Sequence, residues 1–86
     1  MPRISVFYGI YIYMYWKEHN PPHFHAFYGD NEAEIFIKPF GLRKGKLPPK
    51  AIGMLAEWVA LYETELLENW EFGRANKDFK SIEPLK

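Results

Sequence analysis

Apolar and polar-aromatic residues alternate near the start of the chain. Ile10, Ile12, Met14 and Trp16 alternate with Tyr11, Tyr13 and Tyr15. A period of two in β-branched and aromatic residues predicts a strand. Gly9 separates this strand from a shorter extended segment at residues 4–8. Asn20-Pro21-Pro22 must end it, because proline has no amide hydrogen to give to a β-ladder.

A second alternation predicts a β-hairpin. Residues 23–28 and 32–38 flank Gly29-Asp30-Asn31, a segment that tolerates positive φ. A two-residue loop at Asp30-Asn31 would place Phe24, Ala26 and Tyr28 opposite Ile37, Ile35 and Ala33. The other face would then carry His23, His25 and Phe27 beside Lys38, Phe36 and Glu34. A loop of odd length would mix the two faces, since a slip of one residue inverts every side chain.

The second half of the chain is predicted to form a short strand and then a helix. Residues 42–47 would add a short edge strand, with lysines that discourage further pairing. Pro48 and Pro49 suit the first turn of a helix. Apolar residues then follow helical spacing: Ile52, Leu55, Val59, Tyr62, Leu66 and Trp70. Because this helical stretch is longer than most helices of globular proteins, we expect a kink or a second helix start near Thr64. In the tail, Phe79, Ile82 and Leu85 are spaced to dock on the domain or to fray.

These elements predict one α+β domain over residues 1–86, with the sheet at 4–47, the helical region at 49–75 and the tail at 76–86. We expect a small antiparallel sheet of three to four strands, with one face covered by a long or kinked C-terminal helix. The residues that should meet the helix are Ile10, Ile12, Met14, Phe24, Ala26, Ile35 and Ile37.

Composition narrows the class of protein. Because 48% of the residues are hydrophobic and 19% aromatic, an 86-residue chain can fill a core. The absence of cysteine excludes disulfides and thiolate chemistry, so we expect a cytoplasmic protein. Eleven basic and eleven acidic residues argue against avid, non-specific nucleic-acid binding. The apolar stretch at 4–16 is too short and too polar for a membrane span, so no membrane association is expected.

The three histidines are the main candidates for chemistry. His23 and His25 are two residues apart in a predicted strand, so both imidazoles leave the same face. His19 precedes a Pro-Pro turn that could fold it back toward them. Three converging imidazoles would suit a divalent metal such as zinc, with one position left for water. The nearby candidates for a fourth ligand, a supporting partner or a base are Glu18, Asp30 and Glu34.

Two other interpretations of the histidines stay open. His23 and His25 could act without a metal as general acid and base, for example in cleaving a phosphodiester. Alternatively, the imidazoles could simply pack in the fold, hydrogen-bonded to carboxylates or to the backbone.

The face opposite the helix is predicted to be aromatic. Besides His23 and His25, it would carry Tyr11, Tyr13, Tyr15, Phe27 and Phe36. Such a patch usually marks an interaction site, so we expect a protein partner or a homodimer, unless the tail covers it. Stacking of single-stranded RNA on the sheet is the alternative. A basic patch, either solvated or in contact with phosphate or an acidic partner, comprises Arg43, Lys44, Lys46 and Lys50.

Four segments carry a resemblance to a known family: residues 1–10 (MPRISVFYGI), 19–26 (HNPPHFHA), 45–48 (GKLP) and 65–70 (ELLENW). Together they resemble the bacterial family catalogued as domain of unknown function 4160. The family has no established activity. Its genes often lie beside another small uncharacterised gene, an arrangement similar to a toxin–antitoxin pair. The resemblance therefore implies a toxin-like protein that acts on RNA and is neutralised through its aromatic face.

Two hypotheses follow. In the first, the chain is a toxin–antitoxin-like interaction module that binds a protein through Tyr11, Tyr13 and Tyr15. In the second, it is an RNA or phosphodiester hydrolase that uses His23 and His25, with or without a metal.

Overall fold

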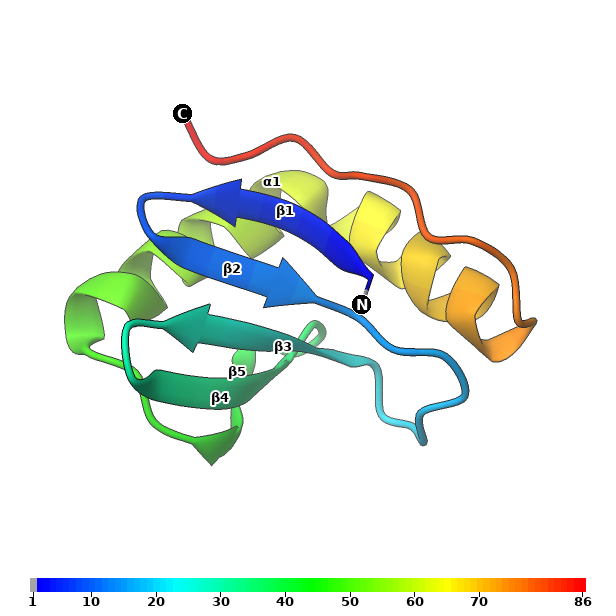
Figure 1. The fold of residues 1–86 in the computed structure, drawn as a ribbon, viewed down its shortest axis with the longest axis horizontal. Helices are drawn as coiled ribbons and strands as arrows, with labels where there is room; N and C mark the ends of the chain where they lie inside the picture. The colour runs from blue at the N-terminus through cyan, green and yellow to red at the C-terminus, as the bar shows by residue number, and fades with distance from the viewer. Residues whose placement is uncertain (1) are drawn as a thin grey trace.

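Five antiparallel strands precede one long helix in the computed structural model, which describes residues 2–86 (Figure 1). The elements are β1 Arg3–Phe7, β2 Ile10–Tyr13, β3 His23–Tyr28, β4 Asn31–Phe36, β5 Gly41–Gly45 and α1 Pro49–Arg74. Each strand pairs with the next along the chain, in the order β1-β2-β3-β4-β5. The predicted α+β class is confirmed, whereas the predicted count of three to four strands is wrong.

The additional strand arises from a tight turn at Tyr8-Gly9. Phe7 pairs with Ile10, and both turn residues have positive φ, 50° at Tyr8 and 80° at Gly9. Two-residue hairpin turns of this kind favour Asn, Asp or Gly at the first position. Because a tyrosine occupies this position, the sequence does not indicate the hairpin and predicts only a short extended segment at residues 4–8.

The β3–β4 hairpin has the predicted faces but a different register. Tyr28 pairs with Asn31, so the two-residue loop is Gly29-Asp30 rather than Asp30-Asn31. Gly29 has φ +59°, which glycine adopts without a steric cost. Because the register moves by two residues, the side chains of the paired strands stay on their predicted faces. Lys38 is the exception, since β4 ends at Phe36 and Nζ of Lys38 lies 3.9 Å from Oε1 of Glu63 in α1.

The corrected register changes which side chains face each other on the outer surface. His23 lies opposite Phe36 rather than Lys38, and His25 lies opposite Glu34 rather than Phe36. The correction therefore brings a carboxylate beside an imidazole.

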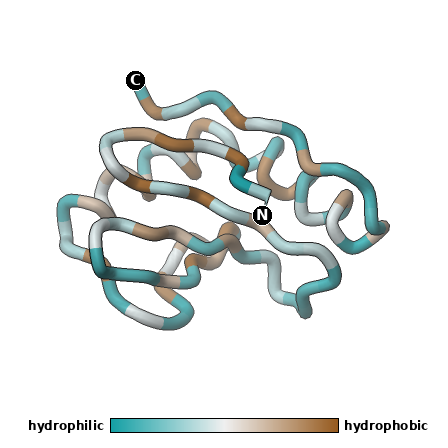
Figure 2. Tube along the Cα trace, in the orientation of Figure 1, coloured by the Kyte–Doolittle hydropathy of each residue, from teal (hydrophilic) through white to brown (hydrophobic). Residues whose placement is uncertain are grey.

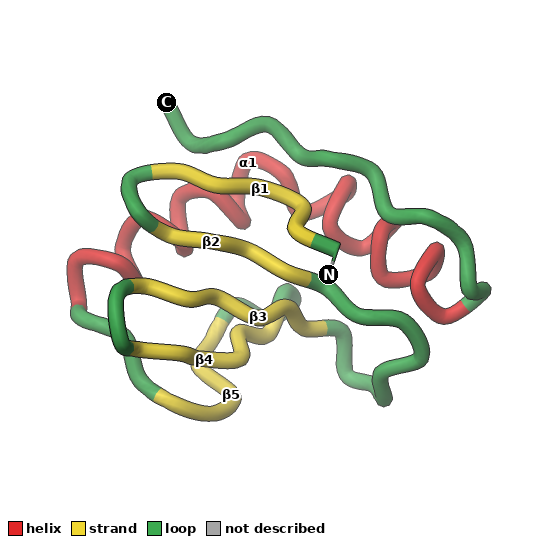
Figure 3. Tube along the Cα trace, viewed as in Figure 1, coloured by secondary structure: helices red, strands yellow, loops and turns green. Residues whose placement is uncertain are grey.

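Helix α1 packs on the inner face of the sheet, behind the strands in the view of Figures 1 and 3. All seven residues predicted to meet it are buried: Ile10, Ile12, Met14, Phe24, Ala26, Ile35 and Ile37. In Figure 2 the hydrophobic positions recur along β1 and β2. Tyr62 has non-helical φ and ψ, so the kink lies close to its predicted position near Thr64. Within residues 2–86, no helix is both long and apolar enough to cross a membrane.

The C-terminal tail docks on the domain and runs beside β1 (Figure 1). The amide of Ile82 donates to the carbonyl of Ile4 at 2.8 Å. The buried side chain of Asn69 binds both the amide and the carbonyl of Lys80. Ile82 and Leu85 are buried, so of the two expected outcomes the tail docks.

Candidate metal centre

The segment at 14–22, between β2 and β3, forms one wall of the candidate site. Three hydrogen bonds join it to the end of α1 and the residues that follow: Lys17 N to Gly73 O, Trp16 Nε1 to Lys77 O, and Trp70 Nε1 to Asn20 Oδ1. These contacts fix the path of the segment, and Glu18 lies in its middle. The helix therefore positions Glu18 against the beginning of β3.

His23 is buried, with only 3% of its side chain exposed, and its ring packs 5.1 Å from that of Trp70. Its Nδ1 lies 2.8 Å from the carbonyl oxygen of Pro21. A carbonyl can only accept, so Nδ1 carries the hydrogen and Nε2 presents a lone pair in the neutral ring. Nε2 is buried and has no hydrogen-bond partner.

His25 lies beside the same carboxylate. Its Nε2 is 2.8 Å from Oε1 of Glu18, and the carboxylate accepts this hydrogen bond. The ring of Tyr15 meets the imidazole edge-on, with 4.7 Å between the ring centroids. The contacts of Glu18 and Tyr15 together fix the orientation of the His25 ring.

Glu18, His23 and His25 each offer one potential metal-binding atom, and the three atoms lie within 4.8 Å of one another. Nε2 of His23 is 3.5 Å from Oε1 of Glu18, which is long for a hydrogen bond. Ligands placed 2.0–2.1 Å from a tetrahedral zinc ion lie about 3.3 Å apart, which is close to this separation. The Pro21 carbonyl on Nδ1 is the kind of outer contact that orients metal-bound histidines.

Glu34 of β4 lies next to this group, but its carboxylate is bound by Arg43 of β5. Its Oε1 is 3.8 Å from Nε2 of His23, and the same oxygen accepts a hydrogen bond from Nη1 of Arg43. Only 17% of the Glu34 side chain is exposed. The carboxylate is therefore close to the centre and is bound by a cation of β5.

The residues that come together differ in one position from the predicted three histidines. His23 and His25 come together as expected, but His19 is exposed and lies outside the group. Glu18, predicted as a candidate fourth ligand, supporting partner or base, lies in the group in the position that was expected for His19. Asp30 lies in the β3–β4 turn, at the opposite end of β3 from His23.

Three of the predicted aromatic residues, Tyr13, Tyr15 and Phe27, contact one another beside this group. Tyr13 stacks near Tyr15 and meets Phe27 edge-on, with ring centroids 6.4 Å and 5.4 Å apart. Tyr11 is 42% exposed, whereas the others, Phe36 included, are half-buried. This aromatic layer reaches the candidate centre through the contact between Tyr15 and His25.

The environment of Tyr15 affects its ionisation. Burial raises the pKa of the Tyr15 hydroxyl above its ordinary value of 10.0, and Tyr13, Glu32 and Glu18 contribute to the rise. Each of these causes disfavours the charged phenolate. Tyr15 therefore remains a neutral phenol over the physiological pH range.

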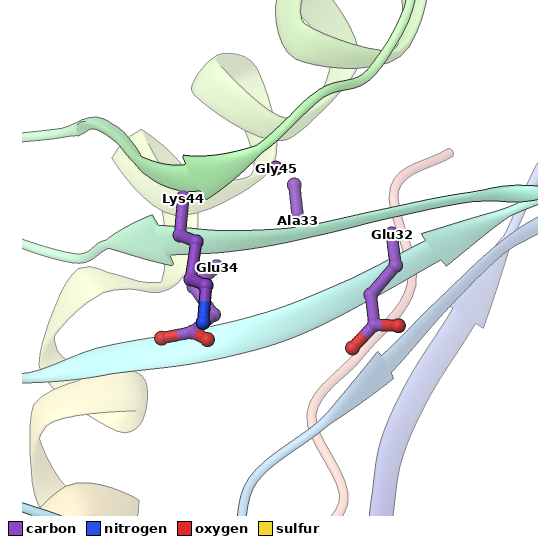
Figure 4. A pocket seen from close by; sticks show the side chains of 5 residues that line it. All are labelled: Glu32, Ala33, Glu34, Lys44 and Gly45. Carbon is purple, nitrogen blue, oxygen red and sulfur yellow. The ribbon is translucent and has the colours of Figure 1, made fainter.

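The predicted basic patch divides into two parts. Arg43 and Lys44 lie in β5 beside Glu34, whereas Lys46 and Lys50 are exposed further along the chain. A pocket of about 300 Å³ adjoins the centre and is lined by Glu32, Ala33, Glu34, Lys44 and Gly45. Figure 4 shows the side chains of Glu32, Glu34 and Lys44 extending to the same side of the sheet. Glu34 lines this pocket and also lies beside His23 of the candidate centre.

Comparison with known proteins adds one finding. No curated protein and no solved structure matches the chain significantly. One family model matches residues 9–71, a span that contains Glu18, His23, His25 and Glu34. The chain therefore belongs to the family described as Domain of unknown function (DUF4160).

Proposed function

We propose that this protein is a metal-dependent hydrolase of phosphodiesters, with a zinc-like divalent ion held by Glu18, His23 and His25. One observation carries the proposal: the buried Nε2 of His23 has no hydrogen-bond partner and lies 3.5 Å from Oε1 of Glu18. Glu18, His23 and His25 together offer three ligand atoms within 4.8 Å of one another. Leaving a buried polar atom unsatisfied costs about 1–3 kcal/mol. A metal ion in this position would satisfy Nε2 and remove that cost.

The type of ligand supports a catalytic centre rather than a structural one. Two histidines and one glutamate form a ligand set found in catalytic zinc sites, where a fourth position holds water. For His25, the ion would replace the hydrogen that its Nε2 shares with Glu18. The three ligands come from two rigidly placed segments, β3 and the docked segment at 14–22.

The metal would supply an activated water molecule near neutral pH. In hydrolysis, the water oxygen forms a bond to phosphorus, and the bond from phosphorus to the leaving alcohol oxygen breaks. One proton of the water ends on that alcohol, and the other stays with the phosphate monoester. No oxidant or reductant is needed.

Local charge supports an anionic substrate. Around the centre and its pocket, the carboxylates of Glu18, Glu32 and Glu34 outnumber the cations Arg43 and Lys44 by one. The net charge of these five side chains is therefore −1. A bound divalent ion would raise it to +1. The metal-loaded face would then attract a phosphodiester, which the metal-free face would repel.

Metal analysis of protein purified without a histidine tag tests the proposal. We expect one zinc ion per chain by mass spectrometry and calorimetry in the wild type, and loss of that ion in His23→Ala, His25→Ala and Glu18→Ala. His19→Ala is the matched control and should bind as the wild type does. Equal binding by His23→Ala and the wild type would overturn the centre. No cleavage of bis(4-nitrophenyl) phosphate by the metal-loaded protein would overturn the hydrolase.

A second function, a protein-interaction module, rests on the aromatic layer. The helix covers the inner face of the sheet, while Tyr11 on the outer face is 42% exposed. We propose that a partner, as in a toxin–antitoxin-like pair, or a second copy of the chain covers this layer. Light scattering and co-expression with the product of the adjacent gene test it, with Tyr11→Ser as the variant. A monomer that forms no complex would exclude this function.

Both functions are proposed for the cytoplasm, since a chain without cysteine suits a reducing compartment.

A further inference from the structure

We infer that Arg43 holds Glu34 away from the metal centre and thereby keeps the fourth coordination position open for water. This inference rests on the proposed metal centre and assigns Arg43 a positioning role in it. The contact behind it is direct, because Nη1 of Arg43 binds the oxygen of Glu34 that faces His23.

Glu34 is close enough to become a ligand itself. Its Oε1 lies 3.8 Å from Nε2 of His23, compared with 3.5 Å for Oε1 of Glu18. Glu34 also pairs directly with His25 across the β3–β4 ladder. A rotation of its side chain would bring a carboxylate oxygen to an ion bound at Nε2 of His23.

Such a fourth ligand would change the chemistry of the site. Zinc with four protein ligands forms a closed structural site, whereas three ligands leave a position for the reacting water. A second carboxylate would also cancel the remaining positive charge of the ion. The site would bind metal more tightly but would lose both its water and its attraction for phosphate.

The β4–β5 ladder places Arg43 where it can prevent this. Glu34 pairs with Lys44, but Ile35 pairs with Leu42, so Arg43 is an extra residue at a β-bulge. Bulges redirect a side chain, and without one Arg43 and Lys44 would point to opposite faces. The bulge lets Arg43 reach Glu34 on the outer face. A guanidinium remains charged at any physiological pH and has five N–H donors for a carboxylate.

Cobalt substitution with azide as a probe of the open position tests the inference. In the wild type, azide should change the visible spectrum of the bound Co²⁺ by occupying the open position. In Arg43→Ala, we expect no response to azide and about tenfold tighter Zn²⁺ binding, a change of the size that contacts around a metal ligand produce. Glu34→Gln/Arg43→Ala should restore the azide response, because an amide is a poor metal ligand.

Lys44→Ala is the matched control, since it removes a neighbouring cation but leaves the Arg43–Glu34 contact. Arg43→Gln provides a second variant with a side chain of similar length, and circular dichroism checks the fold of each protein. An Arg43→Ala protein that keeps both the azide response and the wild-type affinity would overturn the inference but not the metal centre. A wild type that binds no Co²⁺ would overturn both, so the two failures are distinguishable.

Discussion

His25 and Glu34 lie directly opposite each other in the β3–β4 ladder. The pair places an imidazole that binds Glu18 beside a carboxylate that binds Arg43. Two acidic side chains thus approach the histidines from different elements, one from the docked segment at 14–22 and one from β4. The proposed chemistry depends on keeping these two carboxylates in different roles.

Zinc should stabilise the wild-type fold through the candidate centre. A ligand that binds only the folded state adds about 2.7 kcal/mol to the free energy of unfolding when its free concentration is about 100 times its dissociation constant. We expect a rise in melting temperature on adding Zn²⁺, reversed by a chelator. His23→Ala should show no such rise, whereas His19→Ala should behave as the wild type. A rise of equal size in His23→Ala would show that zinc binds elsewhere.

Asn69→Ala should release the C-terminal tail. The Asn69 side chain is buried and binds both the amide and the carbonyl of Lys80. Removing it leaves these backbone groups without their partner, at a cost of about 1–3 kcal/mol. Chemical denaturation should show this loss, and the Ile82 amide should exchange its hydrogen faster. Glu65→Ala, at an exposed position of the same helix, should leave both quantities nearly unchanged.

Gly45→Ala and Gly53→Ala should have opposite effects on stability. Gly45 has φ +82°, and a Cβ there would collide with the backbone carbonyl of Glu32. We expect a loss of about 1–3 kcal/mol, the cost of a strained backbone position. Gly53 lies in α1 with open space around its Cβ position, so alanine should stabilise the helix by about 0.5–1 kcal/mol. Thermal melts of the two variants provide the comparison, and equal melting temperatures would contradict it.

Tyr15→Phe should reduce the loss of stability that occurs as the pH rises into the alkaline range. Burial raises the pKa of Tyr15 in the folded protein above 10.0, its ordinary value in the unfolded chain. Between these two pKa values the unfolded chain loses its proton first, so stability falls as pH rises through this window. Below the unfolded pKa, Tyr15 contributes no pH dependence. Urea denaturation from pH 9 upward should give a shallower decline for the phenylalanine variant, and identical slopes would contradict the assignment.

The faces of the fold could be predicted from the sequence because each face depends only on periodicity. Phe24, Ala26 and Ile35 are buried as expected, even though the hairpin register moved by two residues. The turn at Tyr8-Gly9 could not be predicted, because tyrosine with positive φ has no sequence signature.

Of the candidate ligands, only those in a strand could be predicted from the sequence. His23 and His25 share a face because they are two residues apart in β3. Glu18 and His19 lie in the segment at 14–22, whose path depends on contacts with α1 and the residues after it. Lys17 has φ +59°, a left-handed position that no periodicity indicates. Local sequence therefore could not determine that Glu18, rather than its neighbour, faces the histidines.

The docked tail also affects how copies of this protein could associate through their sheets. Its contact with Ile4 covers the outer edge of β1, while β5 forms the other edge of the sheet. Pairing edge to edge through β5 would join two copies and would leave the covered β1 edge of each facing outward. Growth by strand addition would therefore stop at two chains, whereas a chain lacking the tail would offer two edges and could polymerise.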